Sequence, residues 1–392
     1  MLFRSSTYYI GIGSNEGDRL LYLQKALFSI SDQLGIIRSV SSVYESPALG
    51  FEGENFLNAC LELESEFSPE RLLQACLELE KTYGRIRLGK GYANRPLDID
   101  LLMGPVALNT PSLELPHPRM NHRRFVIEPL CEIAPHLEIA NQSIKEVRKM
   151  LEKDPSQPIS KTKTNLLRNK KELWHTSKNV VLEGCIGVGK STLCKAVAER
   201  YELSSRYERF DKNPYLESFY KDPKAYALPV ELHFLLDRFD ALKTNQAAEG
   251  LVSDYHLSKS LLFAKNNLNE IDFELFSRYY RWGERLLKAP GLYVLLENSL
   301  DRILENIKKR GRSYEQNIDP EYLKSITKGY QDFIKRQKRW NILVIDLSLL
   351  PSYEDPSFSD TVIERIENAL LEVHWKKQTN KTTRTKKGLT LF

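Results

Sequence analysis

The sequence has few of the features that mark secreted or membrane proteins. No stretch approaches about 18 uninterrupted apolar residues, which excludes an ordinary membrane span. The start of the chain reaches a polar Gly-Ser-Asn-Glu-Gly-Asp run before an apolar signal segment develops. Cysteine is scarce, with no CxxC pair and no zinc-like spacing, so we expect reduced thiols that pack in a core and a cytoplasmic protein. The five cysteines are Cys60, Cys76, Cys131, Cys185 and Cys194.

Excess charge of one sign is also small. The net charge of +5 gives little reason to expect nucleic-acid binding. A good part of it falls in a basic tail, residues 374–392, which we predict to be a disordered end. With 41% hydrophobic and 28% charged residues, the composition is that of a globular protein. Its 392 residues exceed what one core usually supports, which favours two domains.

Two patterns divide the chain. Short strand-like runs alternate with helical patterns in the first part, whereas one strand opens a long series of helices in the second. The Lys-rich stretch between them holds Pro155 and Pro158 and is typical of a linker. The predicted boundaries are a domain over 1–155, a linker over 156–177, a domain over 178–373 and the tail over 374–392.

The first domain has the expected order β-α-β-β-α-β, which predicts an α+β ferredoxin-like sandwich. Asp18 and Ser68 are expected helix N-caps, and apolar residues follow each at three- and four-residue spacing. The predicted strands are 8–12, 37–44, 56–64 and 97–103.

The chemistry of this domain gathers in the last predicted strand. Asp98 and Asp100 project from one face because they are two residues apart. Two adjacent carboxylates repel each other unless a cation lies between them, so they are a natural Mg²⁺ site. Arg85, Arg87 and Arg95 lie close by in sequence and could bind a polyphosphate. A solvated strand face with scattered charge is the alternative interpretation.

The motifs around this pair resemble those of 6-hydroxymethyl-7,8-dihydropterin pyrophosphokinases of folate synthesis, from residue 11 to residue 135. The matching motifs are GSN (13–15), YESPALG (44–50), FLNA (56–59), Glu80 with GRIR (84–87), RPLDID (95–100), PHPRM (116–120) and RRFVIEPL (123–130).

The resemblance implies pyrophosphate transfer from ATP to the pterin, with Asp98 and Asp100 as ligands of two Mg²⁺ ions. It implies that the pterin stacks between Phe56 and Phe125, while Asn58 and the backbone near Ala48 and Leu49 read its edge. The implied ATP-contacting and loop-closing residues are Glu80, Arg85, Arg87, Arg95, His117 and Arg123. Two positions depart from the family pattern, Tyr92 for a frequent tryptophan and Ser112 for an arginine of some members.

The second domain opens with a P-loop in the context that the motif requires. An apolar strand over 179–183 runs into GCIGVGKST (184–192), and a helical pattern follows. Gly184, Gly187 and Gly189 let backbone N–H groups face a triphosphate. Lys190 is expected to reach the β- and γ-phosphates, and Ser191 and Thr192 begin the helix, with Ser191 as a Mg²⁺ ligand.

Four later segments resemble deoxynucleoside kinases, particularly the bacterial deoxyadenosine and deoxyguanosine type. They are YERFDKNPYLESFYKDP (207–223), YALPVELHFLLDR (226–238), SDYHLSKSLLFAKNNL (253–268) and KKRGRSYEQNI (308–318), ahead of a predicted strand over 342–347.

The resemblance implies an α/β P-loop kinase with a parallel sheet flanked by helices. It makes Glu208 the general base for the sugar 5′-hydroxyl and gives Arg310 and Arg312 the role of a phosphate-clamping lid. The implied nucleoside contacts are Tyr220, Glu231, Phe234 and Arg238. It also implies a homodimer through this domain.

Two departures bear on this domain. Asp254-Tyr255 stands where the family frequently has an acid-arginine pair, so Asp254 keeps a role at Mg²⁺ while Lys259 or Arg238 replaces the arginine. Glu231 stands where an amide usually meets the base, which leaves the base preference open.

The leading hypothesis is therefore a bifunctional enzyme that binds ATP, Mg²⁺, a pterin and a deoxynucleoside. One alternative keeps only the pterin enzyme and makes the P-loop domain a nucleotide-sensing or dimerising module. Another is a general P-loop NTPase fused to the pterin enzyme.

Overall fold

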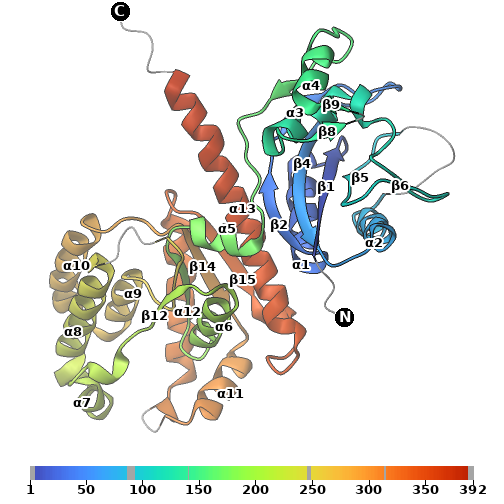
Figure 1. Ribbon diagram of the computed structural model, residues 1–392. Coiled ribbons are helices and arrows are strands. Elements are labelled where there is room, and N and C mark those ends of the chain that lie inside the picture. The colour runs from blue at the N-terminus through green and yellow to red at the C-terminus, as the bar shows by residue number, and fades with distance from the viewer. Residues whose placement is uncertain (1–4, 86–92, 140, 245–248, 313–314, 387–392) are drawn as a thin grey trace, which may run out of the picture. The chain divides into compact units, whose positions relative to one another are not determined.

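The computed structural model describes residues 5–85, 93–139, 141–244, 249–312 and 315–386 (Figure 1). Two compact units divide the chain between Glu172 and Leu173, and the residues from Lys377 onward group with the first unit. In the described residues no helix is both long and apolar enough to cross a membrane. All five cysteines are buried and unpaired, as their expected packing role requires.

The first unit is built on an antiparallel sheet in which β1 lies between β4 and β5. Both β2 and β3 pair with the other edge of β4. The strands are β1 (Ser6–Ser14), β2 (Ile36–Val40), β3 (Tyr44–Ser46), β4 (Phe56–Ser65), β5 (Asp98–Met103), β6 (Leu108–Asn109), β7 (Glu114–Leu115), β8 (Glu138–Ile139), β9 (Gln142–Ser143) and β10 (Ser160–Lys161). The helices are α1 (Arg19–Gln33), α2 (Pro69–Thr82), η1 (Met120–His122), α3 (Arg124–Ile133) and α4 (Ile144–Glu152).

The sheet of the first unit carries a core on each face. Tyr8, Ile10 and Ile12 of β1 belong to a cluster with residues of α1 and α2. Tyr9 belongs to a second cluster with residues of α3 and α4. The side chains of a strand alternate between faces, so a strand that is apolar on both faces requires helices on both. The helices on the second face are an addition to the predicted β-α-β-β-α-β order.

The predicted strand over 37–44 is wrong as one continuous strand. The structure has β2 and β3 with an interruption at residues 41–43. Ser41 forms two bonds with Cys60: its backbone N–H donates to the Cys60 carbonyl, and its Oγ accepts from the Cys60 N–H at 2.9 Å. The next residue, Ser42, donates from Oγ to a carboxylate oxygen of Glu132 at 2.8 Å. These serines therefore satisfy the backbone with side-chain bonds where the strand would have continued.

The predicted linker over 156–177 is also wrong, and the first domain does not stop at residue 155. β10 pairs with β3, and Leu166 belongs to the core beneath α1 and α2. The Gln24 side chain donates to the carbonyl of Leu167 and accepts from its N–H, at 2.7 and 2.9 Å. A two-residue strand and two leucines are enough to hold the segment, although its composition is that of a linker.

The second unit is built on a parallel sheet in the order β12-β13-β11-β14-β15 with helices packed around it (Figure 1). The strands are β11 (Val180–Gly184), β12 (Ser204–Arg206), β13 (Leu251–Ser253), β14 (Leu292–Glu297) and β15 (Ile342–Asp346). The helices are α5 (Lys170–Thr176), α6 (Lys190–Tyr201), η2 (Phe210–Lys212), α7 (Leu216–Lys221), α8 (Pro223–Thr244), α9 (Ser258–Asn267), α10 (Glu270–Arg285), α11 (Leu300–Arg310), α12 (Pro320–Arg336), η4 (Leu347–Leu349) and α13 (Ser357–Lys386).

The helices at both ends of this unit differ from the predicted boundaries. Trp174 of α5 stacks on Tyr201 with ring centroids 5.5 Å apart, and both side chains donate to the buried carboxylate of Glu367 on α13. α5 therefore belongs partly to the core of the second unit, where a linker was expected. α13 continues to Lys386, so the predicted disordered tail begins as helix. The tail residue Lys387 lies outside the described residues.

Candidate active sites

Strand β5 presents the two aspartates of the first unit. Ile99 and Leu101 alternate with them and are buried, so Asp98 and Asp100 share the opposite face, as predicted. The neighbouring strand β1 places Gly13 opposite Asp98. A Cβ atom on Gly13 would lie 3.1 Å from the amide oxygen of Asn58, closer than most such contacts. Glycine at this position therefore lets Asn58 lie beside the aspartates.

Arginines from different segments surround this pair. Arg85 and Arg95 both form ion pairs with Asp98, the latter at 2.6 Å. Arg123 lies 3.8 Å from Asp100. Buried Glu80 accepts bonds from Arg85 and from the N–H of Ile99, the latter at 2.8 Å. With only 2% of its surface exposed, Glu80 holds Arg85 and β5 in place, which differs from the predicted contact with the nucleotide.

The electrostatics of the pair favour a bound cation. Burial and the adjacent charge of Asp98 raise the pKa of Asp100 to about 6. The charge of Arg123 lowers the pKa of Asp100 and offsets part of this effect. Carboxylate oxygens are the ligands that Mg²⁺ prefers. Two carboxylates on one strand face therefore form a donor set that fits a divalent cation.

A cavity of about 260 Å³ opens beside this face. Phe56 and Phe125 both line it, and a guanidinium lies near each ring: Arg95 at 5.1 Å from the Phe56 centroid and Arg123 at 5.6 Å from that of Phe125. Its lining includes the predicted Leu49, Asn58 and Asp98. It also includes residues to which the sequence analysis assigned no role: Ser46, Pro47, Gly50 and Arg119, which lie in the quoted motifs, and Phe51 and His122, which do not.

The remaining predicted residues of this site have other positions. Ala48 lies between Pro47 and Leu49, which line the cavity. The backbone N–H of His117 donates to the carbonyl of Leu102 at 2.8 Å, and burial with the charges of Arg123 and Arg119 lowers the pKa of His117. That imidazole is therefore neutral at pH 7. Arg87 and Tyr92 lie outside the described residues.

The P-loop of the second unit has the predicted strand–loop–helix geometry. β11 leads into the loop and α6 begins at Lys190, after Gly189 in a left-handed conformation. Gly184 also has a positive φ, and a Cβ atom there would lie 2.3 Å from the carbonyl oxygen of Leu296, so only glycine fits. Gly187 has a positive φ as well, while Thr192 follows in the first turn of α6.

Lys190 lies folded back into the loop. Its ammonium donates to the carbonyls of Gly184 and Cys185, each at 2.9 Å. Burial and the nearby charge of Lys259 lower the pKa of Lys190 to about 8. An anion in the loop would supply the negative charge that this ammonium lacks.

A chain of contacts links the P-loop to Glu208. The Ser191 hydroxyl donates to one carboxylate oxygen of Asp254, and the other accepts from the N–H of Glu208 at 2.9 Å. Asp254 therefore lies next to the predicted Mg²⁺ ligand Ser191. Tyr255 is buried in the core between α8, α9 and α10, which removes it from the ligands of this site.

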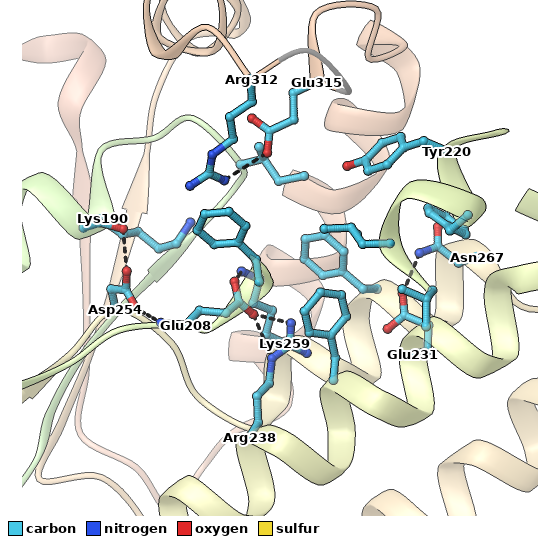
Figure 2. A pocket seen from close by; sticks show the side chains of 18 of the residues that line it. Lys190, Glu208, Tyr220, Glu231, Arg238, Asp254, Lys259, Asn267, Arg312 and Glu315 are labelled. Carbon is cyan, nitrogen blue, oxygen red and sulfur yellow. Dashed lines mark hydrogen bonds and ion pairs between the residues drawn. The ribbon is translucent and has the colours of Figure 1, made fainter. Parts of the chain in front are cut away.

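Two cations hold the Glu208 carboxylate. Lys259 donates to Oε2 at 2.5 Å, and Arg238 donates to Oε1 from Nε at 2.9 Å (Figure 2). Burial alone would raise the pKa of Glu208, but the charges of Lys259 and Arg238 outweigh it and hold the pKa well below its usual range. Glu208 is therefore ionised at neutral pH and able to accept a proton. Both cations that the sequence offered in place of the missing arginine reach this carboxylate.

The predicted lid is held by a residue that the sequence analysis missed. Arg310 and Arg312 both form ion pairs with Glu315, the latter at 3.2 Å. The Arg312 guanidinium also lies 3.6 Å from the ring centroid of Phe210. A phosphate that draws the two arginines toward itself would compete with Glu315 for them.

A cavity of about 320 Å³ joins these groups. Figure 2 shows Lys190 and Asp254 at one end of it and Glu231 and Asn267 at the other. Glu231, Phe234 and Arg238 line it from α8, because spacings of three and four residues place them on one helix face. Tyr220 lines it from α7. The lining residues that the sequence analysis did not assign are Ile186, Tyr207, Phe210, Leu216, Phe219, Val230, Phe263, Asn267, Glu315 and Tyr322.

Comparison with known families gives two matches. Residues 9–135 match the model of the 7,8-dihydro-6-hydroxymethylpterin-pyrophosphokinase family, and residues 180–372 match that of the deoxynucleoside kinase family. The two matched segments lie in different units of the fold and contain the two cavities.

Individual relatives divide in the same way. A 2-amino-4-hydroxy-6-hydroxymethyldihydropteridine pyrophosphokinase of Porphyromonas gingivalis is 40% identical over 134 residues, 33% of this chain and 91% of the relative. A deoxyguanosine kinase of Lactobacillus acidophilus is 30% identical over 220 residues, 51% of this chain and 96% of the relative. A deoxyadenosine kinase of the same bacterium is 30% identical over 208 residues, 50% of this chain and 97% of the relative.

Proposed function

The chain belongs to two enzyme families, the pterin pyrophosphokinases in its N-terminal unit and the deoxynucleoside kinases in its C-terminal unit, and we propose a separate reaction for each of its cavities. It is a bifunctional ATP-dependent transferase. The first cavity would transfer pyrophosphate from ATP to 6-hydroxymethyl-7,8-dihydropterin. The second would transfer phosphate from ATP to the 5′-hydroxyl of a deoxynucleoside. The observation that carries the proposal is that each unit has its own carboxylates, cations and aromatic lining around its own cavity.

In the first cavity, the pterin would stack between Phe56 and Phe125. Asn58, whose amide donates to Ser46 Oγ at 3.0 Å, would meet its polar edge. The pterin hydroxymethyl oxygen attacks the β-phosphorus of ATP, the bond to the α,β-bridging oxygen breaks, and AMP leaves. Arg95 and Arg123 would bind the phosphates, and the charge that they neutralise is largest in the transition state.

Asp98 and Asp100 would hold Mg²⁺ in this cavity. The bound ions would stabilise the attacking and leaving oxygens together. Glu80 acts at a distance in this scheme, because it fixes Arg85 against Asp98. The strand order of the unit supports a ferredoxin-like fold with additional helices on its second face.

In the second cavity, Glu208 would accept the proton of the sugar 5′-hydroxyl. The hydroxyl oxygen then attacks the γ-phosphorus, the bond to the β,γ-bridging oxygen breaks, and ADP leaves. Lys190, Arg310 and Arg312 would stabilise the charge on the transferring group. Ser191 and Asp254 would hold Mg²⁺, whose charge would offset that of the phosphates. Tyr220, Phe234 and Arg238 would surround the nucleoside.

A homodimer through the kinase unit is supported by an apolar stripe on α10. Ile271, Leu275, Tyr279 and Trp282 follow each other at helical spacing and are 82%, 44%, 56% and 65% exposed. Sedimentation of the full chain is expected to give a dimer that Leu275→Asp converts to a monomer, and an unchanged mass would contradict this interface. A cytoplasmic location agrees with five unpaired thiols.

Product analysis tests the pair of reactions. With ATP and the pterin, the full chain is expected to release AMP, and with ATP and a mixture of deoxynucleosides it is expected to release ADP and deoxynucleoside 5′-monophosphates. Because the cavities are separate, saturating pterin should leave the rate of nucleoside phosphorylation unchanged. ATP hydrolysis that no nucleoside stimulates would overturn the second assignment and leave the first intact.

A further inference from the structure

One carboxylate at the nucleoside end of the second cavity has a buried oxygen to which no described residue donates a hydrogen bond. Glu231 on α8 is 3% exposed, and its Oε1 accepts a bond from the Asn267 amide of α9 at 2.7 Å. Its Oε2 is buried and has no hydrogen-bond partner among the residues that the structure describes. Buried polar atoms are nearly always satisfied, and leaving one unpaired is costly. Because Glu231 lines the cavity, a ligand can supply the missing donor (Figure 2).

The position of Glu231 restricts which part of a nucleoside it meets. Phe234 and Arg238 lie farther along the same helix face, and Arg238 holds Glu208. If the 5′-hydroxyl lies at Glu208, as the proposed function requires, the base extends away from the phosphates toward Glu231. Aromatic rings line the space between, and they offer faces on which a base can stack. These rings belong to Phe210, Phe219, Phe234 and Phe263.

The donor and acceptor pattern of the bases then selects the partner. An ionised carboxylate only accepts hydrogen bonds, and its two oxygens offer about four lone-pair sites. Guanine presents two adjacent donors, N1–H and the N2 amino group, that can meet Oε2 and the remaining lone pair of Oε1. Adenine and cytosine place an acceptor nitrogen beside their amino group, and thymine has one N–H between two carbonyls. In each of these bases an acceptor atom would face a carboxylate oxygen, and two acceptors cannot form a hydrogen bond.

We propose that Glu231, oriented by Asn267, is the base-reading residue of the kinase site and that it selects 2′-deoxyguanosine as the acceptor. This inference rests on the proposed function of the second unit and narrows it to one substrate. Asn267 is a positioning residue in this scheme, because its amide fixes the Glu231 carboxylate through Oε1.

The protonation state of Glu231 gives the proposal a second readout. The pKa of Glu231 is raised to about 7. Burial is the largest cause and the charge of Glu208 adds to it, while the charges of Arg238 and Lys259 and the bond from Asn267 act in the opposite direction. Tyr322 on α12 also faces the group, but its own pKa is raised by burial, so the phenol stays neutral. Above about pH 7 the carboxylate is ionised and suits guanine. Below it, the neutral acid can donate to adenine N1 and accept from its amino group.

The experiment measures kcat/KM of the full chain for 2′-deoxyguanosine, 2′-deoxyinosine and 2′-deoxyadenosine. Deoxyguanosine is expected to be preferred, and deoxyinosine, which lacks the N2 amino donor, should be about tenfold to a hundredfold poorer. From about pH 8.5 to about pH 6 the ratio of kcat/KM for deoxyguanosine to that for deoxyadenosine should fall by about 300-fold, because the ionised fraction of Glu231 falls about tenfold while its neutral fraction rises about thirtyfold. All other titrating groups act on both substrates, so the ratio isolates the group that reads the base.

A matched pair of variants completes the test. Glu231→Gln is expected to reverse the preference toward deoxyadenosine and to make the ratio independent of pH, because an amide both donates and accepts. Glu217→Gln removes the same charge from the exposed side of α7 and should change neither the base preference nor its pH dependence. Equal use of deoxyguanosine and deoxyinosine by the unmodified chain, or a ratio that pH does not move, would overturn the proposal even if Glu231→Gln failed to fold. A chain that phosphorylates no deoxynucleoside would instead overturn the proposed function.

Discussion

The two units shift the pKa of their site carboxylates in opposite directions. Asp100 has a raised pKa, because burial and the charge of Asp98 raise it and Arg123, 3.8 Å away, offsets them only in part. Glu208 has a lowered pKa, because Arg238 and Lys259 both contact it. Burial acts in the same direction on both groups. The number of cations in direct contact therefore helps to decide whether the pKa of a site carboxylate moves up or down.

The largest expected effects come from removing each carboxylate in turn. Glu208→Gln should lower nucleoside phosphorylation by about 10²–10⁴-fold, since an amide cannot accept the proton. Asp100→Asn should lower pyrophosphate transfer to the pterin by about 10²–10³-fold, since it removes half of the cation site. Each variant is the control for the other, and both rates are measured on the same preparation. Loss of both activities in either variant would contradict the separation of the two cavities.

A smaller effect is expected from removing one of the two cations, Arg238 and Lys259, that contact the Glu208 carboxylate. Arg238→Met leaves a buried carboxylate short of one partner and should lower the free energy of unfolding of the second unit by about 3–5 kcal/mol. All four tryptophans lie in Leu173–Lys376, so their fluorescence in urea reports this unit alone.

The pH dependence gives this prediction a sign. A lowered pKa contributes stability at neutral pH that is lost as pH falls through the native pKa. With Arg238 replaced, the native pKa of Glu208 rises toward its unfolded value, so acidification should remove less stability from the variant than from the unmodified chain. If the variant unfolds at the same urea concentration as the unmodified chain at every pH, Lys259 alone is sufficient to stabilise the Glu208 carboxylate.

The smallest expected effect concerns a solvent-facing ion pair between Arg209 and Asp237, the residue that precedes Arg238 on α8. Arg209 and Asp237 are 2.5 Å apart, with 51% and 20% of their side chains exposed. Arg209→Gln should change the free energy of unfolding by about 0–1 kcal/mol, and added salt should remove even that difference. A loss as large as that from Arg238→Met would mean that distance, and not burial, sets the value of these pairs.

Local motifs made the greater part of both sites predictable. The P-loop, the aspartate pair and the α8 face each lie within a few residues, so strand or helix periodicity places their side chains. Residues that are far apart in the sequence and come into contact only in the folded protein could not be predicted in this way. Asn267 contacts Glu231 across 36 positions, and Ser46 reaches Asn58 only because β3 pairs with β4. Glu315 was missed because a lone acid after an arginine pair looks like surface charge.

Boundaries were the least predictable feature, because short contacts decide them. β10 is two residues long, and its pairing with β3 and the burial of Leu166 draw a Lys- and Pro-containing segment into the first unit. The composition of this segment therefore does not predict the domain boundary. Two apolar side chains and one strand pair place the segment in the first unit.

The way in which Gln24 and Trp174 are anchored determines how the two activities can be produced as separate polypeptides. A fragment that ends at residue 155 would lack Leu167, and the Gln24 amide would lose both of its backbone partners. A fragment that begins at residue 178 would lack Trp174 and expose Tyr201 together with the Glu367 carboxylate. Both halves keep these contacts only when the break falls between Leu167 and Leu173, a window shorter than two helical turns.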